Sequence, residues 1–336
     1  MQKSDRYSRQ MLVNQIGVAG QQQIAKAKVV IVGMGGLGCQ VGMQLAGAGV
    51  GSLRVVDHDV IDISNLHRQS LYREADIGAA KALIAVRELK ALNSEISIAA
   101  IDQRVSADNI NSLLDSVGLV VDAADNFATS YLLSDACLER EVPLVSASVN
   151  RSFGFVGVFC GAYASSKRKN IPSFRALFPR LPKQQLSCDT VGVTGPSVGI
   201  IANIQAQETL KVLLDDSNAL YGNILYADLW QYKFHPIDFS KALEPNDSRI
   251  SIIGETHLNQ DDFILDVRNA EEIKTTPQPF LTSAAIPMLE LSERLAEIPS
   301  AKRVVCVCAS GQRALIAAQQ INDLGISDVA ALLPNT

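Results

Sequence analysis

A glycine-rich turn between a strand and a helix is the feature that most limits how this chain can fold. Residues 28–33 read KVVIVG, a short β-branched run that predicts a strand, and residues 37–49 have the composition of a helix. A second strand, SLRVVD at residues 52–57, completes a βαβ unit. Glycines in such a turn allow a tight bend and let a phosphate approach backbone N–H groups. The pattern G-x-G-x-x-G is made by Gly33, Gly35 and Gly38, with Gly36 inside it.

Strand and helix patterns continue to alternate after this unit. Apolar strand patterns at residues 96–101, 118–124, 143–149 and 154–160 are separated by helical patterns such as residues 81–92. Such alternation is typical of a parallel sheet with helices on both faces. We therefore predict an α/β protein built on a Rossmann-like, doubly wound, mostly parallel sheet.

The last part of the chain repeats this alternation on a smaller scale. Strands are expected at residues 262–267, 303–308 and 328–333, and helices at residues 288–298 and 314–325. A polar stretch precedes this part, and a chain of 336 residues is long enough for two domains. The predicted domains are residues 1–243, which would bind a nucleotide, and residues 251–336, a smaller α/β domain.

Composition excludes several classes of protein. Hydrophobic residues make up 47% of the chain, which is enough for a packed core, and the formal net charge of -5 argues against a general nucleic-acid binder. The start MQKSDRYSRQ lacks an apolar signal core, and no run reaches the roughly 18 apolar residues of a membrane span. We therefore expect a cytoplasmic protein with no membrane partner. The six cysteines are scattered, unlike those of a disulfide scaffold.

Polar residues after the second strand narrow the chemistry. Asp57 lies 19 residues beyond Gly38, where a carboxylate accepts hydrogen bonds from ribose hydroxyls, and a dehydrogenase would fit equally well up to this point. Asn65 and Arg68 follow at once and Lys81 begins the next helical pattern, so cations and an amide gather near the phosphates. A hydride-transfer enzyme has no use for that cluster.

An acidic residue at the same sheet edge predicts a magnesium ligand. Asp125 follows the strand pattern at residues 118–124, at the edge where ligands bind in open α/β sheets, and Asp122 is a rival. The sequence has no G-x-x-x-x-G-K-[ST], which disfavours a P-loop kinase or GTPase. The combination suggests chemistry at the α-phosphate of ATP.

Taken together, these segments resemble the MoeB/ThiF/HesA family, which is related to ubiquitin-activating enzymes. The resemblance rests on RYSRQ, GMGGLG, DHDVIDISNLHRQ, the later Lys81 and DNFAT, and covers roughly residues 4–240. It implies ATP-dependent adenylation of the C-terminal glycine of a ubiquitin-like sulfur-carrier protein ending in Gly-Gly. It further implies that Asp57 binds ribose, that Asn65, Arg68 and Lys81 hold phosphates and that Asp125 holds Mg²⁺. Arg9 would reach the ATP of the partner subunit in a homodimer.

The chain also departs from that family. Residues 164–185, which contain three prolines, predict a long loop, and Ser173 and Ala176 stand where members carry the first Cys-x-x-Cys pair of a structural zinc site. We therefore expect no structural zinc. Ser130 replaces an arginine after DNFAT. Cys188 matches a cysteine that in some members bonds covalently to the carrier, and this role and that of a bystander thiol stay open.

A second cysteine has the setting of a sulfur-transfer site. Cys308 follows a strand pattern and precedes a helix, where backbone N–H groups and the helix dipole stabilise a thiolate, whereas Cys306 alternates into the core. The four residues between Cys308 and Arg313, with Asp266 and Arg268 in LDVR, resemble rhodanese. A tyrosine-phosphatase loop would have five residues between the cysteine and the arginine. The resemblance implies that Cys308 carries a persulfide for the adenylated carrier, with a cysteine desulfurase as a sulfur donor.

Two other functions remain open from the sequence. The missing zinc ligands and Ser130 are compatible with a non-catalytic scaffold that binds a ubiquitin-like partner. A nicotinamide oxidoreductase would explain the glycine-rich turn and Asp57 but would leave Asn65, Arg68, Lys81 and Asp125 without a role. Carrier choice has no short motif, so molybdopterin, thiamine and other thiolation pathways are not distinguished.

Overall fold

The computed structural model describes residues 6–161, 171–181, 192–245 and 249–335. Cys188 lies outside these ranges, so its predicted covalent role is not addressed by the structure. No helix in the described ranges is long and apolar enough to cross a membrane.

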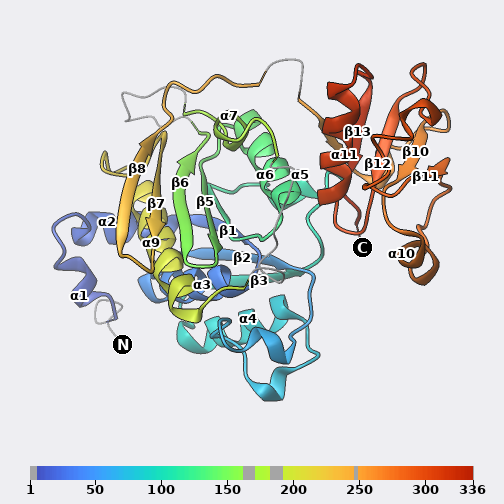
Figure 1. Ribbon diagram of the computed structural model, residues 1–336. Helices are drawn as coiled ribbons and strands as arrows, with labels where there is room; N and C mark the ends of the chain where they lie inside the picture. Colours follow the sequence, from blue (N-terminus) through green and yellow to red (C-terminus); the bar gives the residue numbers. More distant parts are fainter. Residues whose placement is uncertain (1–5, 162–170, 182–191, 246–248, 336) are drawn as a thin grey trace.

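The first sheet has eight strands in the order β3-β2-β1-β4-β5-β6-β7-β8 (Figure 1). Neighbours from β3 to β5 are parallel, and β6, β7 and β8 are added antiparallel. The order reverses between β1 and β4, which is the switch point where ligands bind in doubly wound sheets. The predicted fold class is therefore confirmed. The strands are β1 (Lys28–Val32), β2 (Ser52–Asp57), β3 (Ser97–Asp102), β4 (Leu119–Asp122), β5 (Leu144–Asn150), β6 (Phe153–Phe159), β7 (Asn223–Asp228) and β8 (Lys233–Asp238).

Both faces of this sheet are covered because its central strands are apolar on both sides. In β1, Val29 and Ile31 join one buried cluster, whereas Val30 and Val32 join another, as the two-residue period of a strand requires. Helices α3, α4 and α9 contribute side chains to the first cluster, and α5 and α6 contribute side chains to the second. The helices of this unit are α1 (Ser8–Met11), α2 (Gly17–Lys26), α3 (Gly36–Ala48), α4 (Lys81–Leu92), α5 (Ile110–Leu113), α6 (Phe127–Glu139), α7 (Phe174–Leu177) and α9 (Gly195–Leu213).

A second, all-parallel sheet of five strands follows in the order β11-β10-β12-β13-β9. Its strands are β9 (Ser251–Ile253), β10 (Phe263–Asp266), β11 (Ala284–Ala285), β12 (Val304–Val307) and β13 (Val329–Leu332), and its helices are α10 (Ala270–Thr275) and α11 (Gln312–Asp323). Short 3₁₀ helices occur at η1 (Ile63–Asn65), η2 (Glu74–Asp76), η3 (Glu255–His257) and η4 (Leu295–Glu297). Below, residues 6–245 are called the first unit and residues 249–335 the second unit.

The helix predicted at residues 288–298 is wrong. This segment forms turns and η4 instead of an α-helix. Leu291 and Ile298 are buried, but Leu289 is 95% exposed, so the leucines do not form one buried helical face. Two apolar anchors seven positions apart hold the chain here without a continuous helix between them.

The two units pack against each other through apolar side chains. One buried cluster contains Ile110 of α5 and Ala128 of α6 together with Ala314, Ala317 and Ile321 of α11. In Figure 1, α11 lies beside α5 and α6, on the side of the first unit that is far from α1. Burial of such a shared apolar surface stabilises a fixed arrangement of the units.

Within the long loop predicted at residues 164–185, the described part contains a short buried helix. Phe174 of α7 is 2% exposed and packs on Phe159 and Phe178, with ring centroids 5.2 and 4.8 Å away. The hydroxyl of Ser173 caps the helix by accepting the N–H of Ala176 at 3.1 Å. Aromatic packing, which has no local pattern in the sequence, therefore orders this segment.

Candidate functional site

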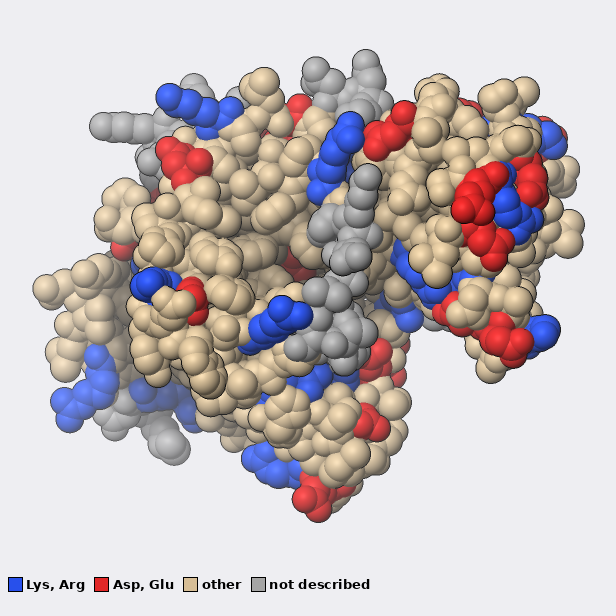
Figure 2. Space-filling model, in the orientation of Figure 1, with Lys and Arg blue, Asp and Glu red and all other residues tan. Residues whose placement is uncertain are grey.

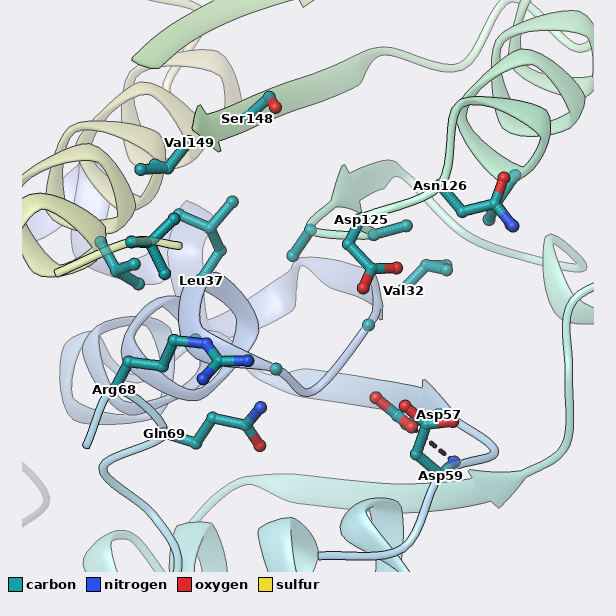
Figure 3. A pocket seen from close by; sticks show the side chains of 18 of the residues that line it. Val32, Leu37, Asp57, Asp59, Arg68, Gln69, Asp125, Asn126, Ser148 and Val149 are labelled. Carbon is teal, nitrogen blue, oxygen red and sulfur yellow. Dashed lines mark hydrogen bonds between the residues drawn. The ribbon is translucent and has the colours of Figure 1, made fainter. Parts of the chain in front are cut away.

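A cavity of about 740 Å³ opens at the carboxyl ends of β1, β2 and β4 in the first unit. Its walls include the glycine-rich turn, the segment after β2 and the segment after β4 (Figure 3). The predicted residues that line it are Gly33, Gly35, Gly36, Asp57, Asn65, Arg68, Lys81 and Asp125. On the face drawn in Figure 2, basic and acidic side chains are interspersed, so that face carries no continuous basic surface.

The glycine-rich turn is closed by backbone contacts that exclude side chains. Gly33 has φ +89°, and a Cβ there would lie 2.7 Å from the carbonyl oxygen of Ala123. A Cβ on Gly38 would lie 1.8 Å from the carbonyl oxygen of Gly33. At Gly35, the nearest atom to such a Cβ is Nε2 of Gln69 at 3.8 Å, so this position borders open space. The first N–H groups of α3, which no side chain caps, adjoin that space and fit an anionic phosphate.

Asp57 is the last residue of β2 and is held rigidly at the cavity wall. Its Oδ2 accepts the N–H of Met34 at 2.6 Å, and its Oδ1 accepts the N–H of Asp59 at 2.8 Å. Burial raises the pKa of Asp57, and the nearby Lys81 charge opposes this shift. Because each oxygen has a second lone pair, the carboxylate can still accept a hydrogen bond from a ligand hydroxyl.

Lys81 begins α4 and is paired with a carboxylate that the sequence analysis missed. Its Nζ lies 2.9 Å from Oδ2 of Asp59, and its side chain is 8% exposed against 53% for Asp59. Burial alone would raise the pKa of Asp59, but the hydrogen bond and charge of Lys81 lower it. Asp59 lies two residues after Asp57 in DHD, so both acids could be seen in the sequence. The pairing of Asp59 with Lys81 could not.

The segment after η1 forms the opposite wall. Asn65 accepts the N–H of Asp62 at 3.2 Å, and a guanidinium nitrogen of Arg68 donates to the Ser64 carbonyl at 3.0 Å. Gln69 is a further lining residue that the sequence analysis passed over. Its side chain is buried, yet its Oε1 has no hydrogen-bond partner among the described residues. A buried amide oxygen of this kind fits a donor on a bound ligand.

The two rival aspartates after β4 have different surroundings. Asp122 is fully buried and accepts a hydrogen bond from Oγ of Ser146 at 2.8 Å. Burial raises the pKa of Asp122 to about 6, although hydrogen bonds from Ser130 and Ser146 lower it. Asp125 is exposed and lines the cavity, and in Figure 3 its carboxylate points toward the space between Arg68 and Asp57. Ser130 therefore supports a buried acid, and Asp125 is the acid available to a ligand.

Three other predicted residues lie outside this cavity. Arg9 is exposed on α1 and is not among the described residues that line the cavity of its own chain. Cys308 lies between β12 and α11 in the second unit, is 1% exposed, and its Sγ accepts the N–H of Ala314 at 3.3 Å. Arg313 forms two hydrogen bonds to Glu272, at 2.8 and 2.5 Å.

One group of three potential metal ligands occurs among the described residues, formed by Asp57, His58 and Asp59, and it does not include Asp125. Mg²⁺ usually keeps several waters and takes one or two protein carboxylates together with substrate phosphates. The single carboxylate of Asp125 therefore fits that mode of binding without a preformed cluster.

The fold and the site define an α/β protein with a glycine-rich turn and a polar cavity at the switch point of a doubly wound sheet. The chain belongs to the ThiF family, whose model matches residues 7–248.

Named relatives support this assignment. The chain is 40% identical over 231 residues to "Adenylyltransferase and sulfurtransferase MOCS3" of Culex quinquefasciatus, which covers 68% of this chain and 51% of that protein. It is also 40% identical over 235 residues to "Sulfur carrier protein adenylyltransferase" of Thermus thermophilus, covering 69% of this chain and 86% of that protein. The chain thus spans about half the length of the MOCS3 proteins that it matches.

Solved structures agree at the level of the fold. The structure titled "Crystal structure of E. coli MccB + ATP" aligns with a TM-score of 0.58 and 24% identity, over 71% of this chain and 72% of that chain. A second structure of the same protein, with succinimide, aligns with a TM-score of 0.61 and 23% identity, over 72% of this chain and 73% of that chain.

Proposed function

We propose that this chain uses ATP to adenylate the C-terminal glycine of a ubiquitin-like sulfur-carrier protein and then transfers sulfur to it from Cys308. The adenylation activity is supported by one observation: the glycine-rich turn, Asp57, Arg68 and Lys81 all line the same cavity. The names of the MOCS3 and Thermus relatives support the same activity and the same kind of partner.

The adenylation step follows from the charges around the cavity. A carboxylate oxygen of the carrier bonds to the α-phosphorus of ATP, the bond from that phosphorus to the bridging oxygen breaks, and pyrophosphate leaves. Arg68 and Lys81 stabilise the negative charge that develops on the phosphates, and Asp57 holds the ribose. Mg²⁺ held by Asp125 would supply further charge neutralisation.

The sulfur half of the proposal rests on the setting of Cys308. We propose that residues 251–336 form a rhodanese-like domain behind the adenylating residues 1–243. The Cys308 thiolate attacks the outer sulfur of a sulfane donor such as thiosulfate, the donor S–S bond breaks, and sulfite leaves. The outer sulfur of the resulting persulfide attacks the acyl carbon of the adenylate, and AMP leaves. This step leaves the carrier joined to Cys308 through an acyl disulfide. Two thiol equivalents then reduce that bond to a carrier thiocarboxylate and free Cys308, and the two thiols are themselves oxidised to a disulfide.

We propose a homodimer in which Arg9 completes the ATP site of the partner subunit. Arg9 is exposed on a short helix outside its own cavity, which leaves it available for that contact. We also propose that the first unit needs no structural zinc. The N–H and hydroxyl of Ser173 donate to the carboxylate of Glu244 at 2.7 and 2.6 Å, so hydrogen bonds tie the α7 segment to the end of this unit.

The test is carrier-dependent exchange of labelled pyrophosphate into ATP, measured with purified protein, Mg²⁺ and carriers that end in Gly-Gly. Exchange with one carrier, and not with the same carrier lacking its last glycine, supports adenylation and identifies the pathway. Tight carrier binding without exchange would instead support the scaffold function.

A further inference from the structure

The loop that follows Cys308 is bound to the rim of the cavity in the first unit. Nδ2 of Asn126 donates to the carbonyl of Ser310 at 2.9 Å, and a guanidinium nitrogen of Arg104 donates to the carbonyl of Ala309 at 3.4 Å. The Oδ1 of Asn126 caps α6 by accepting the N–H of Ala128 at 2.8 Å, which fixes the orientation of the amide. The cysteine loop therefore docks on a rigid helix start.

The cavity itself extends to this loop. Gln312 lines the same cavity as Gly35, Asp57 and Asp125, so its wall contains residues of both units. Gly311 has φ +79°, and a Cβ there would lie 2.4 Å from Leu333, so the loop is shaped for close packing at this point.

Arg104 lies between the cavity of the first unit and the loop that follows Cys308. It lines the cavity, and its Nε is buried without a hydrogen-bond partner among the described residues. Burial lowers the pKa of Arg104, and the charges of the nearby acids Asp59 and Asp125 oppose that shift. One guanidinium thus lines the cavity of the first unit and contacts the loop that follows Cys308.

Asp108 anchors the second unit away from the cavity. Its carboxylate accepts hydrogen bonds from the hydroxyl of Thr256 and from Nδ2 of Asn335 at 2.9 Å, and it lies 3.2 Å from Nδ1 of His257. A Cβ on Gly254 would lie 2.2 Å from Oδ1 of Asp108, so glycine allows this approach. The Asp108 side chain is 13% exposed and does not line the cavity.

We propose that the adenylated carrier end stays in this cavity and receives sulfur from Cys308 of the same chain, whose loop adjoins the cavity wall, and that Asp108 is the positioning residue that holds the two units in register. This inference rests on the proposed function and adds to it the route of transfer. The carrier tail stays in the cavity after adenylation, and the outer sulfur of the Cys308 persulfide attacks it from the side where Gln312 of the second unit lines the wall, with AMP as the leaving group. Arg104 stabilises the negative charge on the sulfur and on the departing phosphate.

The first experiment compares Asp108→Ala with Asp115→Ala, which changes an exposed carboxylate on the same part of the chain. For Asp108→Ala we expect carrier-dependent pyrophosphate exchange and thiosulfate-to-cyanide sulfur transfer to stay within about twofold of wild type, while thiocarboxylate formation falls at least about tenfold because orientation is lost. Asp115→Ala should match wild type in all three assays. An equal fall in all three for Asp108→Ala would mean a general structural role and would overturn the assignment.

Hydrogen exchange tests the shared cavity without turnover. A non-hydrolysable ATP analogue should slow amide exchange in residues 309–312 of the wild-type chain, and should do so much less in Asp108→Ala. An analogue that protects the glycine-rich turn and leaves residues 309–312 unchanged would contradict the shared cavity. Protection of both segments with no pyrophosphate exchange would reject the proposed function and keep the shared cavity.

Mixing two defective chains tests whether transfer stays within one chain. Lys81→Ala keeps the sulfur site and Cys308→Ser keeps the adenylation site. Transfer within one chain predicts that an equal mixture forms thiocarboxylate at under about a tenth of the wild-type rate. The reason is that no chain in the mixture has both an intact adenylation site and Cys308. Recovery to roughly half the wild-type rate would show transfer between chains and would overturn the proposal.

Discussion

The ammonium of Lys81 lies 2.9 Å from the carboxylate of Asp59, at the wall of the cavity that also contains Asp57. The lysine is nearly buried and the aspartate is half exposed. A nearly buried lysine with one carboxylate partner is held in position before any ligand arrives. The pair therefore holds the Lys81 ammonium at the cavity wall, where the proposed function needs a cation.

Replacement of Lys81 should reduce adenylation more than it reduces stability. For Lys81→Met we expect a loss of about 100-fold or more in carrier-dependent pyrophosphate exchange, in keeping with the loss of one preorganised charge. Lys90→Met, at an exposed position of the same helix, is the matched control and should keep the wild-type rate. A Lys81→Met protein that unfolds at the wild-type urea concentration and retains full exchange would exclude a role for Lys81 at the phosphates.

Two glycines of α3 give a paired test of the glycine-rich turn. A methyl group on Gly38 would meet the Gly33 carbonyl at 1.8 Å, whereas one on Gly47 would meet nothing within 4 Å. Gly38→Ala should therefore destabilise the chain by about 1–3 kcal/mol and weaken ATP binding, because the turn must open. Gly47→Ala should stabilise it by about 0.5–1 kcal/mol. Urea unfolding and ATP titration measure both, and equal behaviour of the two variants would contradict this account of the turn.

The glycine-rich end of the cavity was predictable because its parts lie close together in the sequence. Gly33, Gly35, Gly38 and Asp57 belong to one βαβ unit, and that unit fixes their relative positions wherever it occurs. Alternation of strand and helix patterns likewise determined the fold class.

The remaining features depend on contacts between distant segments. Arg104 and Asp108 receive their roles from residues about 150 to 230 positions away, such as Thr256, Ala309 and Asn335, and no local pattern encodes such pairs. The orphan oxygen of Gln69 becomes visible only once neighbouring elements are packed around it. In the same way, tertiary packing and not apolar spacing decided the conformation of residues 288–298.

The hydrogen bonds between Ser173 and Glu244 should support the α7 segment without a metal. Ser173→Ala removes a helix cap and a hydrogen bond to a carboxylate, for an expected loss of about 1–2 kcal/mol. Glu139→Ala, at an exposed position of α6, should change stability by less than about 0.5 kcal/mol. We expect no zinc by elemental analysis and no effect of a chelator on unfolding. A stoichiometric zinc, or a chelator-sensitive unfolding transition, would contradict the prediction.

The buried carboxyl of Asp122 should make stability fall as pH rises. Burial raises the pKa of Asp122 from its ordinary value of 3.8 to about 6, so between these pH values the folded chain binds more protons at this site than the unfolded chain does. The contribution of Asp122 to the free energy of unfolding therefore decreases from about pH 4 to about pH 6 and is constant above that range. Asp122→Asn removes the titrating group, and its stability relative to wild type should rise across this range. Asp115→Asn, at an exposed site, should show a nearly constant difference. Urea unfolding of the three proteins from about pH 4 to about pH 7 measures these curves, and a difference for Asp122→Asn that does not change with pH would show that Asp122 keeps an ordinary pKa in the folded chain.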